Sequence, residues 1–545
     1  MNKEKIINKL FASSGVYVLL LLLTAFKLFQ HYNAQIDLQL SDDGDYILYS
    51  FANFNKLHLD FGPSYSVYLK LFHLFSKNPV SIFLYNYVLL CTLFPLLLFL
   101  FFIRIKIKPF IAFIICFIVL TSEFNLNNQM PHVTHFVLCL FLMSLIVSTY
   151  FNAKIIKLVI FNFALLIACY ARPELFLSFL LFNLWLIIEL IKNKEYANRK
   201  NIVAVGLLFL FSLLLFINYK LPVSASVLGY NRSVLAYYQH DLISRRMHGD
   251  NAIEKVYYWD WISAVYGNSK NLSELISHYP KLFIQHIIWN VKLNAGLAAY
   301  LIISLMFPIT ILYKKIGILL AVLIGVVIII FSIKKRKSVM LQFRSSTFYF
   351  WVLLFFSIPF FITCLLIFPR FHYMFAIVPL ICFILVQAYE GICINLSSNK
   401  LKIVILSCYF LLTILTPSLL QLKFSFGKDG INSDLCMKKT VTYINQNFSN
   451  NKHIVYCAQN FVGYLNPDKF TYYHLIHLQG SNHVSYRHFL DSLNIDLIVY
   501  DAPTFLNGFI KADTSWVNIT QQPEINGYRK INPGFCSDYY ILKKE

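Results

Sequence analysis

Long runs of apolar residues recur along this 545-residue chain, and many approach the ~20 residues with which a helix crosses a ~30 Å hydrocarbon layer. Hydrophobic residues make up 58% of the chain and charged residues only 13%, so the runs cannot be the cores of ordinary soluble helices alone. The sequence predicts a polytopic α-helical membrane protein with about 11–13 transmembrane helices. The candidate spans lie near 11–30, 81–103, 109–121, 132–151, 155–170, 173–191, 201–219, 297–312, 316–333, 347–368, 371–394 and 401–420.

The first run follows a short basic head. It is long for the core of a signal peptide and has no clear small-residue cleavage site, so we interpret it as a retained span.

Lysine and arginine in the short loops predict the orientation of the spans, because such residues favour the cytoplasmic side. Loop 31–80 is acidic and is expected outside, and the alternation up to residue 219 puts segment 220–296 outside as well. Two runs then separate this segment from the basic residues 334–337, which leaves two alternatives. Either one of the two runs is re-entrant, or a further crossing lies near 281–299. With 11 or 13 spans, the tail after residue 420 is outside. The loops expected inside carry Arg104, Lys106, Lys108, Lys154, Lys157, Lys192, Lys194, Arg199, Lys200, Lys334, Lys335, Arg336, Lys337, Lys400 and Lys402.

The net charge of +21 does not indicate a nucleic-acid partner, because the basic residues are spread over many loops. Anionic membrane lipids are the expected partner of these loops.

The tail, residues 425–545, has a different character, with turn residues and apolar runs of strand length. Buried strands are expected at 453–458, 496–501 and 539–544, with a helix at 486–494. We therefore predict two domains: a transmembrane domain, 1–420, and a small soluble α/β domain, 425–545. The tail holds three cysteines, Cys436, Cys457 and Cys536, which permit at most one disulfide there.

Four histidines lie close together in this tail. No cysteine or carboxylate stands beside them at metal-ligand spacing, so solvated loop histidines are the expected interpretation rather than a metal site. They are His474, His477, His483 and His488.

Directly after the first span, the stretch 41–46 (SDDGDY) contains three carboxylates. A helix that starts here would carry Asp42 and Asp45 on one face, with Asp43 to the side. One explanation is an N-terminal cap with acids that complement the helix dipole. Three acids exceed what a cap requires, so we expect them to have a function.

A second helix is expected over 64–75, after Gly62 and Pro63. Its aromatic side chains would share one face and lie on the bilayer surface. The alternative is that this segment begins the second span, which Pro79 argues against. The aromatic residues are Tyr65, Tyr68, Phe72 and Phe75.

This arrangement resembles the GT-C superfamily of membrane glycosyltransferases, which includes the protein O-mannosyltransferases and the lipid A aminoarabinose transferases. In those proteins the first external loop opens with an Asp-Glu-x-x-Tyr type motif, and Asp42–Tyr46 is similar to it, with Asp in the second place. Gly62-Pro63 looks like the family's later Pro-Pro. The span count, the large central loop and the external C-terminal domain also agree with the family.

Three further segments are similar to family features. They are 171–174 (ARPE) with Arg172, 369–373 (PRFHY) with Arg370 and His372, and the second external loop with Glu123 and His132. His132 stands where family members commonly have Asp. Each segment also has an ordinary explanation, since the arginines could anchor helix ends, Glu174 could simply pair with Arg172, and the histidines could be polar helix-end residues.

The central loop contains Arg245 and Arg246 and the aromatic run 257–261. These residues could bind phosphate and sugar rings. An interfacial aromatic belt explains the aromatic run equally well.

The resemblance implies an inverting glycosyltransferase that uses a polyprenyl-phosphate-linked sugar and acts on a hydroxyl of a glycan, lipid or protein acceptor. Asp42 or Asp43 would be the base, and Asp45 would complete the acidic group. Arg172, Arg370, His372, Arg245 and Arg246 would bind the donor phosphate, and Glu123 and His132 are the second-loop candidates. A divalent metal is an optional cofactor. The expected location is a bacterial plasma membrane, with the site and the C-terminal domain outside.

Two other function classes remain open. A polysaccharide polymerase or ligase is also polytopic with a large external loop. A lipid or glycan transporter would carry charges within its spans, whereas the runs of this chain are nearly free of charge.

Overall fold

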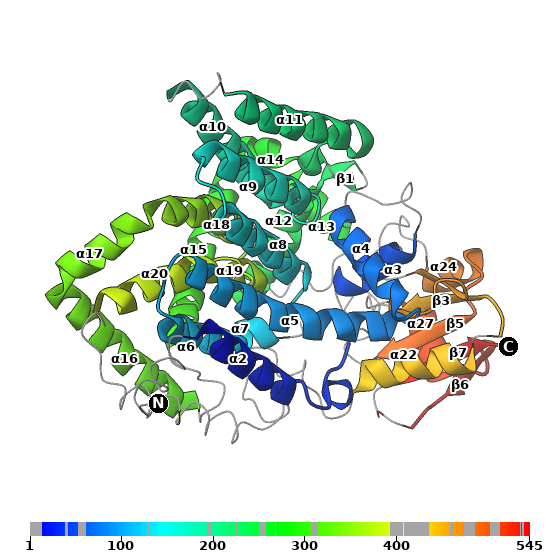
Figure 1. Ribbon diagram of the computed structural model, residues 1–545. Coiled ribbons are helices and arrows are strands. Elements are labelled where there is room, and N and C mark those ends of the chain that lie inside the picture. The colour runs from blue at the N-terminus through cyan, green and yellow to red at the C-terminus, as the bar shows by residue number, and fades with distance from the viewer. Residues whose placement is uncertain are drawn as a thin grey trace. The chain divides into compact units, whose positions relative to one another are not determined.

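Figure 1 shows the computed structural model of the chain. The structure describes residues 13–38, 42–52, 62–127, 130–192, 198–224, 226–227, 229–249, 258–267, 269–306, 314–392, 407, 435–448, 450–457, 463–473, 485–501, 513–534, 536 and 539–545. The chain divides into two compact units. The helical unit comprises residues 1–33, 87–224 and 290–428, and the loop-and-sheet unit comprises 34–86, 225–289 and 429–545.

The helical unit is built from the apolar runs of the sequence. Among the described residues, eight helices are long and apolar enough to cross a membrane, and α6 and α8 are shorter apolar helices. Together with the C-terminal sheet they confirm the predicted class, a polytopic helical membrane protein with an α/β region. Its main helices are α2 (Ser14–Leu28), α5 (Pro79–Arg104), α6 (Pro109–Leu120), α8 (Val133–Ser148), α9 (Lys154–Cys169), α10 (Phe176–Lys192), α11 (Arg199–Tyr219), α15 (Pro280–Met306), α16 (Lys314–Lys334), α18 (Thr347–Leu366) and α20 (Val378–Ile392).

Helix α15 removes one of the two alternatives for the region before residue 334. This segment and the following residues up to Met306 form one continuous helix, because no proline interrupts it after Pro280. A separate crossing near 281–299 is therefore absent from the described residues. The expected run 401–420 lies outside them, apart from residue 407.

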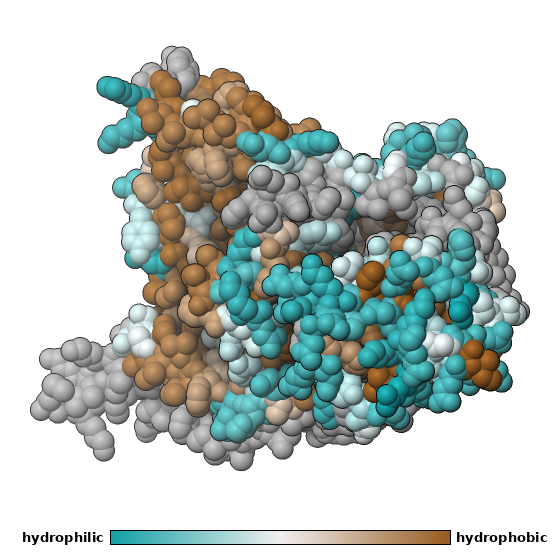
Figure 2. Space-filling model, turned by 90° about the vertical axis from the view of Figure 1, so that its right-hand side faces the viewer, coloured by the Kyte–Doolittle hydropathy of each residue, from teal (hydrophilic) through white to brown (hydrophobic). Residues whose placement is uncertain are grey.

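Neighbouring helices of this unit pack through aromatic and aliphatic side chains. In the interior, Phe141 of α8 stacks on Phe356 of α18 with ring centroids 3.9 Å apart. Helix α11 leaves much of its surface uncovered, and Phe209 and Ile217 remain about 70% exposed. Figure 2 shows broad hydrophobic surface of this kind. Apolar side chains left outside in this way suit contact with membrane lipids.

Short connecting elements join these helices. They are η1 (Tyr32–Ala34), α7 (Glu123–Leu126), η5 (Pro173–Leu175), η7 (Pro222–Ser224), α17 (Arg336–Ser345) and α19 (Phe371–Phe375).

The loop-and-sheet unit contains the two predicted external loops and the C-terminal region. Its elements before the C-terminal region are α3 (Asp42–Phe51), α4 (Pro63–Leu69), η4 (Lys70–Leu74), β1 (Ser226–Val227), β2 (Tyr230–Asn231), α12 (Arg232–Met247), α13 (Tyr258–Tyr266) and α14 (Leu272–His278). The C-terminal region adds α22 (Cys436–Asn447), β3 (His453–Cys457), β4 (Phe470–Tyr473), α24 (Tyr486–Ser492), β5 (Leu497–Asp501), α27 (Thr514–Gln521), β6 (Tyr528–Ile531) and β7 (Tyr539–Lys544).

The C-terminal strands form a five-stranded mixed sheet in the order β4-β3-β5-β7-β6. Strand β3 pairs in parallel with both β4 and β5, whereas β7 is antiparallel to β5 and β6. The three strands and the helix expected from the sequence are confirmed as β3, β5, β7 and α24. The edge strands β4 and β6 are shorter, with four residues each, and the sequence did not indicate them.

Both faces of the sheet are covered. On one face, Tyr456, Ile498 and Leu542 join Phe489 of α24 and Trp516 of α27 in a single buried cluster. The alternating residues Val455, Cys457, Leu497, Val499 and Ile541 are buried too, as expected when both faces are covered. Helix α22, which has its own buried apolar residues, lies beside the sheet in Figure 1.

The segment 64–75 is helical, as predicted, but its aromatic face is not where we expected it. Tyr65 stacks near Tyr68, with ring centroids 5.8 Å apart, and Tyr68 contacts Phe72, so these three rings do share a face. However, Tyr65 and Phe72 are buried within the unit, whereas Leu74 and Phe75 are about 80% exposed. The prediction that the whole aromatic face lies on the bilayer is therefore wrong, because helix α3 covers Tyr65.

Candidate functional site

The acidic stretch forms the first turn of helix α3, as the sequence predicts. Carboxylates are favourable at this end of a helix because of the helix dipole. The three side chains differ in burial: Asp42 is half-buried, while Asp43 and Asp45 are only 1% and 7% exposed. Burial of carboxylates is costly, so two buried acids go beyond what capping requires.

Asp45 receives a hydrogen bond from a residue far away in the sequence. The hydroxyl of Tyr472, on the edge strand β4, donates to Oδ1 of Asp45 over 3.3 Å. Burial and the neighbouring charge of Asp42 raise the pKa of Asp45 to about 7, although the hydrogen bond from Tyr472 opposes the shift. Asp45 therefore exchanges its proton near neutral pH.

Asp43 lies beside an aromatic group contributed by α4. Burial, followed by the charge of Asp43, raises the pKa of Tyr65 well above its ordinary value. Tyr65 also contacts Tyr46 edge-on at 5.1 Å, and its hydroxyl accepts a hydrogen bond of 2.7 Å from Asn86. These contacts fix the side of α3 on which Asp43 stands.

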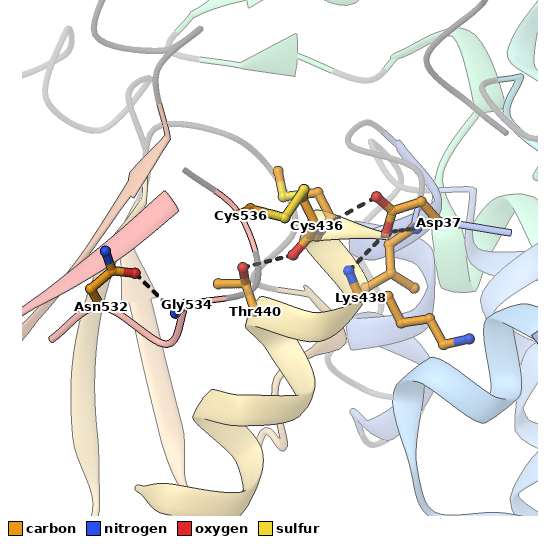
Figure 3. The surroundings of a disulfide bond; sticks show 9 residues. Asp37, Cys436, Lys438, Thr440, Asn532, Gly534 and Cys536 are labelled. Carbon is orange, nitrogen blue, oxygen red and sulfur yellow. Dashed lines mark hydrogen bonds between the residues drawn. A yellow bond between two sulfur atoms is a disulfide. The ribbon is translucent and has the colours of Figure 1, made fainter. Parts of the chain in front are cut away.

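The C-terminal region is bound to the same part of the chain through Asp37, as Figure 3 shows. The carboxylate of Asp37 accepts hydrogen bonds from the backbone N–H groups of Lys438 (2.8 Å) and Met437 (3.2 Å). Asp37 thereby caps helix α22, whose own N-cap residue, Leu435, provides no side-chain hydrogen bond.

Helix α22 also starts at a disulfide. Cys436, its first residue, is bonded to Cys536 near the start of β7, across a sequence separation of 100 residues. The sequence allowed at most one disulfide in this region, and this is the one that forms. Cys457 is buried in β3 and is not part of the disulfide.

A second polar cluster lies in the helical unit around Arg172. Its guanidinium donates to the hydroxyl of Thr134, lies 3.5 Å from Oε1 of Glu174 and stands 5.2 Å from the ring centroid of Tyr373. The predicted pairing of Arg172 with Glu174 is therefore present. The contact with Tyr373 brings the segments 171–174 and 369–373 together.

The segment predicted to be the second external loop joins the same cluster. The ring of Phe124 stacks on Phe371 with centroids 4.4 Å apart, and the fully buried Glu123 accepts a hydrogen bond of 2.6 Å from Tyr300. His372 is buried, whereas Arg370 is half-buried. The family-like segments of the helical unit thus converge on one place.

The two histidines of this loop are buried in the cluster. The ring centroids of His132 and His135 are 5.5 Å apart, and His135 lies against Phe375 at 4.4 Å. Nε2 of His135 lies 3.1 Å from the carbonyl oxygen of Asn125. His132 is the N-cap residue of α8 and His135 lies in its first turn, so both are helix-end residues, and both are buried.

The arginines of the central loop have different surroundings. Nε of Arg245 donates a hydrogen bond of 2.6 Å to the buried carboxylate of Asp241. The same carboxylate accepts a hydrogen bond from the Tyr266 hydroxyl and lies 2.9 Å from Nδ1 of His286. Burial alone would raise the pKa of Asp241, but its hydrogen bond with His286 and the charge of Arg245 outweigh it and hold this pKa below its ordinary value. Arg245 thus serves a structural ion pair, while Arg246 is exposed.

The comparisons with known proteins can now be stated. No family model matches this chain, and no curated protein shows significant similarity to it. The site must therefore be understood from its own residues.

The predicted site residues fall into two groups. Asp42, Asp43, Asp45, Arg245 and Arg246 belong to the loop-and-sheet unit, and Glu123, His132, Arg172, Arg370 and His372 belong to the helical unit. Within the described residues, no group of three histidine, cysteine or carboxylate side chains is arranged to hold a metal ion. His474, His477 and His483 lie outside those residues, and His488 is exposed.

Sequence reasoning missed Tyr472 and Tyr300 as partners of the acidic residues. Tyr472 stands 427 positions from Asp45 and Tyr300 stands 177 positions from Glu123. Neither tyrosine lies in a motif, so no local signal could have identified these pairs.

Proposed function

We propose that this protein is an integral-membrane glycosyltransferase. It transfers a sugar from a polyprenyl-phosphate-linked donor to an acceptor hydroxyl at the outer face of the membrane, with inversion at the anomeric carbon. The observation that carries the proposal is the first turn of α3, where three carboxylates gather and two of them are buried. Buried, interacting acids of this kind are common at catalytic sites.

Asp42 is the best placed of the three acids to act as the base. It is half-buried and so remains accessible to a hydroxyl, whereas Asp43 and Asp45 are enclosed by aromatic side chains. An acceptor hydroxyl is a weak nucleophile, and a carboxylate within hydrogen-bond reach removes its proton as it attacks the anomeric carbon. Asp43 and Asp45 then set the charge and orientation of the first turn.

The cluster around Arg172 is the proposed binding place for the donor phosphate. The leaving polyprenyl phosphate gains negative charge, and arginine donors stabilise that charge in the transition state. Arg370 is half-buried and is the N-cap residue of α19. Tyr373, in the same helix, contacts Arg172. His372, buried in the same segment, adds a further donor.

Two observations support an external site with a lipid-linked donor. Disulfides persist in oxidising compartments outside the cytoplasm, and the C-terminal region contains one. Nucleotide sugars are cytoplasmic, so an external transferase needs a donor that has already crossed the membrane. The many apolar helices suit a substrate with a polyprenyl chain.

The ion pairs of the helical unit favour this function over transport. Lys154 and Glu189 pair near the ends of α9 and α10, and Lys108 pairs with Glu390 near the end of α20. A transport path instead places charged side chains at mid-depth in the spans.

The test is transfer by the purified protein, with a polyprenyl-phosphate sugar as donor and Asp42→Asn as the variant. Asn keeps the size and capping ability of Asp but cannot accept the proton, so turnover should fall by about 10²-fold or more. Asp468→Asn, which changes an exposed carboxylate in a turn of the same unit, is the matched control and should keep the wild-type rate. Wild-type turnover in Asp42→Asn would reject the acidic turn as the source of the base.

A further inference from the structure

We propose that Tyr472 is a positioning residue for the acidic turn of α3, so that the C-terminal sheet is a working part of the site and not an appended module. The inference deepens the proposed function and rests on it where the reaction is concerned. The contact itself can be tested without any activity.

The first argument is the hydrogen bond between these two residues. Tyr472 is the third residue of the edge strand β4, and its hydroxyl donates to Oδ1 of Asp45 over 3.3 Å. Burial and the charge of Asp45 raise the pKa of Tyr472, which therefore keeps its proton and remains a donor. A donor of this kind orients the carboxylate and favours its ionised form.

The second argument is that the backbone brings the same two segments into contact. A Cβ on Gly463 would lie 2.1 Å from the carbonyl oxygen of Gly44, the residue before Asp45. Only glycine permits so close an approach. The carbonyl oxygen of Tyr464 is held in turn by Asn445 of α22 over 3.2 Å. The segment that leads into β4 therefore has a defined place against the acidic turn.

The third argument is the anchoring of α22 by Asp37 and by the disulfide. Asp37 lies a few residues before the acidic turn and caps α22 through two backbone N–H groups. The disulfide ties the same helix end to the start of β7. Three separate contacts thus join the first external loop to the C-terminal region, and the Tyr472 hydroxyl is the one that reaches a carboxylate of the acidic turn.

Titratable groups from several described elements lie near Asp45 and the acidic turn. Asp42 faces it from the same helix and Tyr472 from β4, while Tyr49 of α3 faces Tyr472. Tyr65 of α4 faces Asp43. From η4, the side chain of His73 contacts Ser50 near the C-terminal end of α3, and the side chain of Lys70 donates to the carbonyl oxygen of Ala52, just after this helix. Removal of the Tyr472 hydroxyl therefore changes the protonation of Asp45 without adding or removing a charge.

The experiment compares Tyr472→Phe with Tyr473→Phe in the purified full-length protein. Phe removes one hydroxyl in each case, and neighbouring residues of a strand point to opposite faces, so Tyr473→Phe is a matched control. Without the hydrogen bond Asp45 keeps its proton to higher pH. The pH–rate profile of Tyr472→Phe should move upward by about one pH unit, whereas that of Tyr473→Phe should stay in place. A profile of Tyr472→Phe that coincides with the wild type would overturn the positioning role.

A double-mutant cycle provides a readout that does not depend on catalysis. Thermal unfolding in detergent is measured at pH 8 for Tyr472→Phe, Asp45→Ala, which leaves no acceptor for the Tyr472 hydroxyl, and the double variant. We expect the two changes to be non-additive, because each removes the same interaction. Additive effects would refute the contact and the inference with it. If the wild-type protein transfers no sugar from any polyprenyl-phosphate donor, the proposed function fails, and this cycle still decides whether Tyr472 holds Asp45.

Discussion

Replacing Asp45 with Asn should change how the stability of the protein depends on pH. Burial and the charge of Asp42 raise the pKa of Asp45 from 3.8 to about 7 in the folded protein. Between these values the folded chain binds a proton that the unfolded chain has released, so the free energy of unfolding falls as the pH rises. The stability contribution of the protonated carboxyl is fully present below pH 3.8 and is lost by about pH 7.

The size of the effect follows from the shift. One pKa unit corresponds to about 1.4 kcal/mol, so a shift of about three units amounts to at most about 4 kcal/mol. Asn cannot ionise and does not lose this contribution. The free energy of unfolding of Asp45→Asn, relative to that of the wild type, should therefore increase as the pH rises from 4 to 8.

The assay is thermal unfolding in detergent across this pH range. Asp491→Asn is a control of opposite sign: hydrogen bonds from Arg487 and Lys544 outweigh burial and lower the pKa of Asp491, so its small contribution is present at neutral pH and is lost as the pH falls. Parallel pH curves for Asp45→Asn and the wild type would refute the reasoning, because they would show that Asp45 ionises as readily in the folded as in the unfolded chain.

Two further predictions concern the disulfide and the phosphate cluster. The double substitution Cys436→Ser and Cys536→Ser should lower the free energy of unfolding by about 2–5 kcal/mol, because the bond closes a loop of 100 residues; unchanged thermal unfolding in detergent would contradict this. Arg370→Ala should weaken use of the lipid donor more than Arg370→Lys, because an ammonium keeps the charge of the guanidinium although it loses the fork geometry. Transfer measured against donor concentration tests this, and wild-type kinetics in both variants would reduce Arg370 to a helix-end anchor.

The membrane-spanning character of the chain was predictable from the sequence because it depends on local composition. A run of about 20 apolar residues forms a helix in a bilayer whatever its neighbours are. The helix of the acidic stretch and the central strands of the C-terminal sheet were predictable for a similar reason. Turn residues flank these central strands, and a continuous apolar run such as 453–458 is typical of a strand that is buried on both faces.

The burial of side chains was less predictable. The periodicity of 64–75 correctly placed Tyr65 and Phe72 on one face, but it could not show that α3 covers this face. An amphipathic pattern shows which residues share a face and not what lies against them.

The partners of the candidate site were decided by the tertiary structure alone. Asp45 meets Tyr472, Asp37 caps α22, and Arg172 meets Tyr373, although each pair is separated by about 200–430 positions in the chain. The residue types at 42–45 indicated that carboxylates matter there, and their chemistry is a property of the sequence. Which of them is buried, which is accessible and which one holds a proton near neutral pH depends on the groups that folding brings around them, because burial and neighbouring charges set the pKa.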